Sequence, residues 1–316
     1  MIWQFVSVAI FLAIVAAIYI REIFLLSAFL RSKLSRKGYP PALRAKSAVI
    51  NHFFAVIGIF CIFYGYFIES RWIEVKIIKI PTAKFTHTTL RIVQISDLHC
   101  EAKIRNENRT VEIVNSLNPD IIIFTGDSLN TPKALPVFRD TMRRLKAAIG
   151  KYAVTGNNDL AFARGLDLFH STDFYLLKEE SVRLTKDGEL FFISGLSYEY
   201  SDQWRKTLAG APAGSYSIFL CHKPDLVEEL KGFNVDLYLA GHTHGGQIAL
   251  PFYGALLTLS KYGKKYESGE YSVNGITLYV NRGIGTEGSA LLAARFFARP
   301  EIAVFDIGPN KPHAKD

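Results

Sequence analysis

The stretch RIVQISDLHC, residues 91–100, sets a short apolar run directly before an aspartate and a histidine. An apolar run of this length that ends at polar residues is typical of a buried β-strand. Asp97 and His99 then lie in the segment that follows the strand. Because functional side chains of open α/β sheets gather at the carboxyl ends of the strands, we expect Asp97 and His99 to face a site at the edge of a sheet.

The same pattern, an apolar run followed by polar residues, recurs four times farther along the chain. The polar residues are Gly126–Asp127, Gly156–Asn157–Asn158–Asp159, His222 and Gly241–His242–Thr243–His244. Taken singly, each has an ordinary explanation, because Asp and Asn are frequent turn residues and a lone histidine is more often a core residue. Five strand ends that all carry Asp, His or Asn instead predict one shared site.

The segments around these runs predict the rest of the fold. Helical spacing is present over Asn106–Leu117 and Arg139–Ile149, and Trp72–Ile80 alternates apolar with charged residues as a half-exposed strand does. Helices alternate with strands at first, whereas strands dominate later. We therefore expect an α/β domain in which two packed β-sheets are flanked by helices.

The five motifs, in this order, resemble the motif set of the calcineurin-like metallophosphoesterases over roughly residues 91–307. Two further segments, Gly245–Gly246–Gln247 and Asn281–Arg282–Gly283, are similar to those of the membrane-associated bacterial branch of that superfamily. The resemblance implies a sandwich of two β-sheets flanked by helices. It also implies a hydrolase that uses two metal ions to cleave a phosphate-ester or pyrophosphate bond.

The resemblance also implies a set of metal ligands. One metal ion would be held by Asp97, His99, Asp127 and His244, and the other by Asp127, Asn157, His222 and His242. Mixed imidazole and carboxylate ligands suit Mn, Fe or Zn rather than Ca. We expect two divalent cations, with Mn favoured and Fe or Zn as alternatives, and the sequence assigns no further catalytic residue. Two such cations can stabilise the displacement at phosphorus, so that no side-chain nucleophile is needed.

Asn158 departs from the common family motif, which has a histidine at this position. An asparagine donates a hydrogen bond but no proton at neutral pH, so a leaving group that needs protonation is disfavoured. A phosphate monoester, with a second pKa of about 6, leaves without such help. This reasoning favours a pyrophosphate substrate. Enzymes that split UDP-2,3-diacylglucosamine in lipid A biosynthesis belong to the same superfamily, and one branch of them lacks that histidine too.

The first 70 residues predict a membrane anchor, followed by a metallophosphoesterase domain over residues 71–316. Residues 2–20 contain no charged residue and are long enough to span a bilayer. Residues 48–68 are also strongly apolar and could span the membrane, lie at its surface, or form a core helix. The linker between them, residues 31–47, carries six Lys or Arg and no acidic residue. The positive-inside rule places this linker in the cytoplasm.

The linker also accounts for much of the formal net charge of +8. Because the rest of the chain is only weakly basic, we expect no nucleic-acid partner. The expected partners are the lipid bilayer and a lipid-linked nucleotide or other phosphate ester. Residues 291–299 join apolar to basic residues and could touch acyl chains or the membrane interface. A core helix is the alternative for that segment.

The first functional hypothesis is a hydrolase of the inner membrane that converts UDP-2,3-diacylglucosamine to UMP and 2,3-diacylglucosamine 1-phosphate. If residues 48–68 also span, however, the catalytic domain faces away from the cytoplasm, where UDP-sugars are found. The alternative is then a broad phosphodiesterase or phosphatase on the outer side. A scaffold with a relic metal site is a third hypothesis, which the complete ligand set disfavours.

Overall fold

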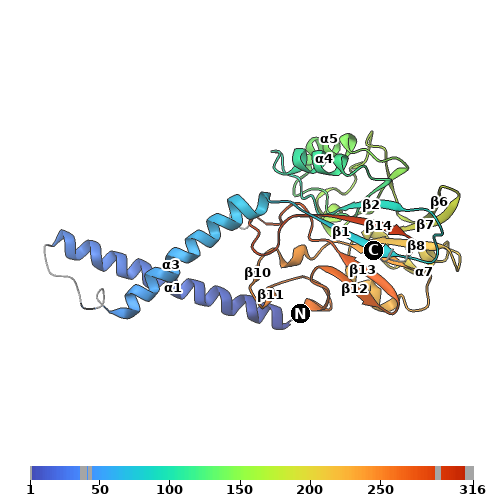
Figure 1. Ribbon diagram of the computed structural model, residues 1–316. Coiled ribbons are helices and arrows are strands. Elements are labelled where there is room, and N and C mark those ends of the chain that lie inside the picture. Colours follow the sequence, from blue (N-terminus) through green and yellow to red (C-terminus); the bar gives the residue numbers. More distant parts are fainter. Residues whose placement is uncertain (1, 36–40, 42–44, 289–292, 310–316) are drawn as a thin grey trace, which may run out of the picture.

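A long helical hairpin and an α/β unit make up the protein (Figure 1). The computed structural model describes residues 2–35, 41, 45–288 and 293–309. Helix α1 (Ile2–Leu34) and helix α3 (Lys46–Phe63) run antiparallel and project from the α/β unit. The chain re-enters that unit through η1 (Tyr64–Ile68) and η2 (Glu69–Arg71). By length and apolar composition, α1 could cross a membrane, and so could α3 together with η1 and η2 (Lys46–Arg71).

Two six-stranded sheets form the centre of the α/β unit, with strand orders β1-β14-β2-β3-β4-β5 and β12-β13-β9-β8-β7-β6. The strands of the first sheet are β1 (Glu74–Pro81), β2 (Leu90–Ile95), β3 (Ile121–Phe124), β4 (Gly150–Ala153), β5 (Phe174–Leu176) and β14 (Glu301–Gly308). Those of the second are β6 (Glu179–Lys186), β7 (Glu189–Leu196), β8 (Tyr216–Cys221), β9 (Leu237–Ala240), β12 (Gly269–Val273) and β13 (Ile276–Val280). The short hairpin of β10 (Ala249–Leu250) and β11 (Gly254–Ala255) stands apart from both sheets. The predicted two-sheet α/β architecture is confirmed.

Strand β3 shows how the layers are held together, because both of its faces are buried. Ile121 and Ile123 pack into the core between the two sheets, while Ile122 and Phe124 pack toward the outer helices. A run of four apolar residues is therefore required here, as is typical of a parallel strand covered on both faces. Helices α4 (Glu107–Ser116) and α5 (Leu135–Arg144) contribute to the outer cluster, and α7 (Trp204–Leu208) contributes to the cluster beyond the second sheet.

The boundaries of α5 differ from the predicted helix Arg139–Ile149. The helix begins earlier, because Pro136 fits its first turn, where no intrahelical N–H bond is lost. It ends earlier because Leu145 is extended and fully buried. The carbonyl oxygen of Leu145 accepts a hydrogen bond from Lys151 Nζ. Packing of the segment before β4 therefore overrides the helical spacing of residues 145–149.

The order of the strands determines where the polar segments meet. Strands β2, β3 and β4 are parallel neighbours in the first sheet, and β8 and β9 are parallel neighbours in the second. Parallel neighbours end at the same edge of a sheet, so the segments that follow them converge. The two sheets bring these two sets of segments together at one edge of the sandwich.

Candidate metal centre

Seven side chains at that edge form the candidate metal centre: Asp97, His99, Asp127, Asn157, His222, His242 and His244. Five of them have a positive φ, namely Asp97 (48°), His99 (43°), Asp127 (59°), His242 (74°) and His244 (53°). Such φ values are uncommon outside glycine, although Asp and His tolerate them better than most residues. The strained backbone turns each side chain inward directly after its strand, and strain of this kind clusters at functional sites.

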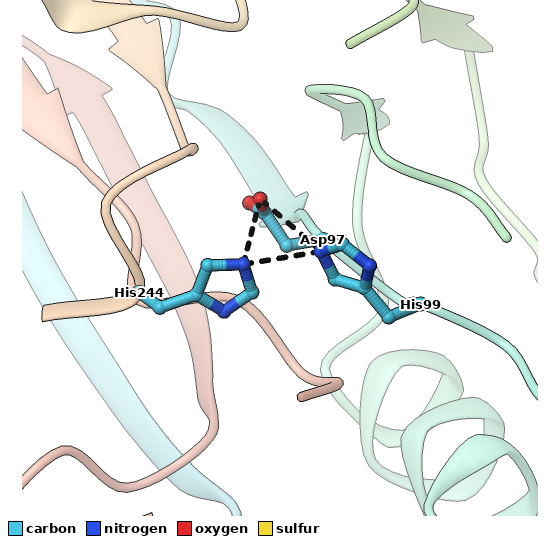
Figure 2. A group of neighbouring side chains, drawn as sticks. All are labelled: Asp97, His99 and His244. Carbon is cyan, nitrogen blue, oxygen red and sulfur yellow. Dashed lines mark hydrogen bonds and ion pairs between the residues drawn. The ribbon is translucent and has the colours of Figure 1, made fainter. Parts of the chain in front are cut away.

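The first group of the centre consists of Asp97, His99 and His244 (Figure 2). The Nε2 atoms of His99 and His244 lie 3.1 Å apart. Asp97 Oδ1 lies 3.4 Å from His244 Nε2 and 4.0 Å from His99 Nε2. All three side chains are buried. Two imidazole nitrogens and one carboxylate that point at one another are a typical donor set for a divalent transition metal.

The second group consists of Asp127, His222 and His242. Asp127 Oδ2 lies 3.2 Å from His222 Nε2, and the rings of His222 and His242 lie 5.0 Å apart. The same Asp127 oxygen lies 3.7 Å from His99 Nε2 in the first group. Asp127 therefore stands between the two groups, in the position that a bridging ligand would occupy.

The lack of hydrogen-bond partners in the second group fits a bound cation. Among the described residues, four buried atoms of this group form no hydrogen bond: Asp127 Oδ2, Asn157 Oδ1, His222 Nε2 and His242 Nε2. Burying a polar atom without a partner costs about 1–3 kcal/mol. Four such atoms in one place, each a possible metal donor, would be satisfied together by a cation. Asn157, at the start of α6 (Asn157–Phe162), thus belongs with the second group.

Electrostatics within the centre also favour a cation. Burial raises the pKa of Asp97 to about 6, and the Asp127 carboxylate contributes to the rise. Burial likewise lowers the pKa of His242 to about 3 and that of His244 well below its usual value. Although burial opposes the shift, Asp127 raises the pKa of His222 to about 10. With lowered pKa values, the imidazoles of His242 and His244 are uncharged at neutral pH and available as metal donors.

Neighbouring groups fix the orientation of the imidazole rings. His99 Nδ1 lies 2.8 Å from Asn130 Oδ1, and His222 Nδ1 lies 2.7 Å from the carbonyl oxygen of Thr125. Both oxygens are acceptors, so each Nδ1 carries the proton and each Nε2 turns toward the centre. Such outer partners commonly orient metal-binding histidines.

Asp159 belongs to the same motif as Asn157 but points into the protein. Its carboxylate accepts hydrogen bonds from the backbone N–H groups of Asp127, Ser128 and Gly156. It therefore ties the segment after β3 to the segment after β4. A side chain at position 156 would clash, because its Cβ would lie 2.1 Å from Asp127 Oδ1. Glycine is required here for the close approach of the two segments.

Two residues near the centre escaped the sequence analysis. Arg295 is fully buried, and its guanidinium contacts His244 Nδ1 at 3.1 Å and the carbonyl oxygens of Arg282 and Ala298. Glu287 forms a third group of possible metal ligands with His99 and Asp127. Both residues follow the Asn281–Arg282–Gly283 segment in loops without periodic pattern, so no sequence signal pointed to them.

Arg295 also changes the interpretation of residues 291–299. Leu291 and Leu292 lie outside the described residues, and no helix is present over residues 293–299. Phe296 packs edge-to-face on Tyr64 at the end of the helical hairpin, whereas Phe297 is exposed. The core-helix alternative is therefore wrong for the described part of this segment. Of its two basic residues, Arg295 faces the metal centre, whereas Arg299 lies over the ring of Trp72.

Comparison with known proteins agrees with this geometry. Residues 90–246 match the family described as calcineurin-like phosphoesterase. The uncharacterized metallophosphoesterase YkuE of Bacillus subtilis is 34% identical over 260 residues, which cover 77% of this chain and 89% of YkuE. The UDP-2,3-diacylglucosamine pyrophosphatase LpxG of Chlamydia muridarum is 28% identical over 288 residues, covering 70% of this chain and 84% of LpxG. This chain therefore belongs to the calcineurin-like phosphoesterase family and is a metal-dependent hydrolase.

Proposed function

We propose that this hydrolase cleaves the pyrophosphate bond of a lipid-linked nucleotide at a membrane surface, with UDP-2,3-diacylglucosamine as the first substrate to test. The observation that carries the hydrolytic part is the pair of facing carboxylate–imidazole groups joined by Asp127. Two divalent cations held there, Mn by preference, would lower the pKa of a water molecule and offset negative charge on phosphoryl oxygens. The seven residues of the metal centre are the proposed ligands.

The residue at position 158 supports a weakly basic leaving group. The Asn158 side-chain amide lies beside the His99 ring, with its Nδ2 3.3 Å from His99 Nδ1, and can donate a hydrogen bond to a phosphate oxygen. It cannot supply a proton. A phosphate monoester departs without one, whereas a simple alkoxide does not. Asn158 therefore favours pyrophosphates over alkyl phosphodiesters.

A pocket beside His222 suits the nucleotide end of such a substrate. It has a cavity volume of about 210 Å³, and its lining includes Tyr198, the cations Lys223 and Lys261 and two acidic residues, Asp225 and Glu229. The Lys223 ammonium lies 5.1 Å from the centre of the Tyr198 ring. An aromatic ring can stack on a base, and a lysine can pair with a phosphate. Because His222 lines the same pocket, a nucleotide there would lie next to the second ligand group.

The helical hairpin supports a substrate that is held in the bilayer. Its apolar side chains face outward, with Ile23 68% and Phe53 60% exposed. Exposed apolar surface of this extent is typical of a protein region that contacts membrane. The similarity to LpxG, whose name specifies UDP-2,3-diacylglucosamine as its substrate, points the same way.

The proposal is tested with the full chain in nanodiscs under saturating Mn²⁺. UDP-2,3-diacylglucosamine should be converted to UMP and 2,3-diacylglucosamine 1-phosphate, much faster than an alkyl phosphodiester is hydrolysed. The two products can be separated and quantified by mass spectrometry. Equal rates on both substrates would defeat the pyrophosphate assignment while leaving the hydrolase class intact.

The hairpin also favours a second candidate, a phosphodiesterase or phosphatase on the outer side of the membrane. If both helices span, the basic linker at the far end of the hairpin lies in the cytoplasm and the α/β unit lies across the bilayer. Protease accessibility in oriented vesicles distinguishes the two candidates. Cleavage of the α/β unit only from the cytoplasmic side would support the nucleotide substrate, and cleavage only from the opposite side would support the second candidate.

A further inference from the structure

Glu287 is an acidic residue at the metal centre that none of the five motifs contains. Its Oε1 lies 3.9 Å from His99 Nε2. Its carboxylate, the Asp127 carboxylate and a ring nitrogen of His99 all lie within 4.8 Å of one another. We propose that Glu287 is a further ligand of the metal ion held by Asp97, His99, Asp127 and His244.

Three hydrogen bonds hold Glu287 in place, two on its backbone and one on its carboxylate. The backbone N–H of Glu287 donates to Gln247 Oε1, at 2.8 Å, and Gln247 Nε2 donates to the Glu287 carbonyl oxygen, at 3.0 Å. Asn158 Nδ2 donates to Glu287 Oε1, at 2.9 Å. The backbone is therefore fastened to the loop that follows His244, and the side chain is fastened to the residue that follows Asn157.

The exposure of Glu287 shows which side of the centre it occupies. Its side chain is 35% exposed, whereas those of Asp97 and His99 are fully buried. Glu287 thus lies on the solvent side of the first group. A carboxylate there can bind the metal ion directly and can be reached by an incoming substrate.

Charge balance gives this carboxylate a role. The seven assigned ligands include only two carboxylates, Asp97 and Asp127, to balance the four positive charges of two divalent cations. The buried guanidinium of Arg295, 3.1 Å from His244 Nδ1, adds positive charge nearby. A third carboxylate lowers this excess, and its hard oxygen donor favours Mn²⁺ over a softer or more imidazole-preferring cation.

Asn158 therefore has a second role, in addition to favouring a leaving group that needs no proton. The Asn158 side-chain amide orients Glu287, because its Nδ2 donates a hydrogen bond to the Glu287 carboxylate. Asn158 is a positioning residue in this respect, since it acts on the metal ion through Glu287.

The test is a titration of chelator-treated full-length protein with MnCl₂, in detergent and without substrate, followed by electron paramagnetic resonance. Glu287→Gln keeps an acceptor for Asn158 but removes the charge, and it should raise the Mn²⁺ dissociation constant by about tenfold or more. Glu270→Gln, at an exposed position of β12, is the matched control and should leave it unchanged. A Glu287→Gln dissociation constant equal to that of the wild type would overturn the proposal.

A second variant keeps the proposal testable if Glu287→Gln does not fold. Asn158→Ala leaves the carboxylate in place but releases it, so Mn²⁺ affinity should fall severalfold, and wild-type affinity would overturn the proposal. The inference rests on the proposed ligands Asp97, His99 and His244. A wild-type protein that binds no Mn²⁺ would defeat that assignment, whereas equal affinities of wild type and Glu287→Gln would defeat the role of Glu287 alone.

Discussion

The metal centre and the helical hairpin depart from the usual rules of a water-soluble protein in opposite ways. The centre buries polar atoms such as His242 Nε2 and Asp127 Oδ2 without hydrogen bonds. The hairpin instead exposes large apolar side chains such as Ile59 and Phe60. Unpaired polar atoms inside a protein require a polar ligand, and exposed apolar helices require an apolar surrounding. Each region therefore favours a different surrounding: metal ions in the centre and, as we propose, lipid around the hairpin.

The two regions are joined directly. At the end of the hairpin, the carbonyl oxygen of Gly65 accepts a hydrogen bond from the backbone N–H of Arg295, whose side chain contacts His244. Glu69 accepts a hydrogen bond from the backbone N–H of Ala298. Near the N-terminal end of α1, Gln4 Nε2 donates a hydrogen bond to Thr258 Oγ1. The segment from Gly65 to Glu69 is thus bonded to the α/β unit at both of its ends, although it continues α3.

The largest effect is expected from removing the residue that links the two ligand groups. Asp127→Ala should lower turnover at least about a thousandfold, because the loss of metal electrostatics costs several kcal/mol in the transition state. Turnover of an aryl phosphate under saturating Mn²⁺ measures this effect. Asp202→Ala, at an exposed turn, is the matched control and should be fully active. Near-normal turnover of Asp127→Ala would refute the ligand assignment.

Changing the proton-donating capacity at position 158 should have the next largest effect. Asn158→His should accelerate cleavage of an alkyl phosphodiester by roughly a hundredfold, the usual contribution of a well-placed general acid. UDP-2,3-diacylglucosamine should gain little, because its leaving phosphate needs no proton. Rates for wild type and variant on both substrates provide the measurement. Equal acceleration of the two substrates would contradict the leaving-group argument.

Removing α1 and the linker should mainly affect membrane-embedded substrates. Removal of residues 1–47 breaks the Gln4–Thr258 hydrogen bond but leaves every proposed metal ligand and the Gly65–Glu69 contacts in place. We expect near-normal turnover of a soluble aryl phosphate and at least about a tenfold loss on a lipid substrate in vesicles, since anchoring raises its effective concentration. Equal losses on both substrates would indicate that α1 is part of the folded catalytic unit.

The smallest effect is expected from the polar contacts inside the hairpin. Glu22 accepts a hydrogen bond from Asn51 Nδ2 and lies 2.6 Å from His52 Nδ1. Glu22→Ala should destabilise the pairing of α1 and α3 by about 1 kcal/mol, the scale of interhelical hydrogen bonds in membranes. Cross-linking between cysteines placed on the two helices would measure this, and turnover of a soluble substrate should not change. A large loss of turnover would mean that the hairpin controls the metal centre.

The strand ends could be predicted from the sequence because apolar runs such as residues 121–124 point to buried strands without any knowledge of neighbours. Strands β6 and β14 were not expected, because charged residues blur the pattern of β6, which pairs with β7, and because β14 pairs with strands that are distant in the chain. The left-handed backbone of His99 and His244 was not predictable either, because it results from close packing of loops. Glu287 and Arg295 reach the centre only through tertiary contacts.

Metal analysis of purified full-length protein tests the central claim most directly. After loading with Mn²⁺ and removal of excess, the protein should retain two metal ions per chain, and Asp127→Ala should retain at most one. Removing the metal with a chelator should abolish turnover, and adding Mn²⁺ should restore it. Fewer than one bound ion per chain in fully active protein, or turnover that survives chelation, would contradict a centre built for two cations.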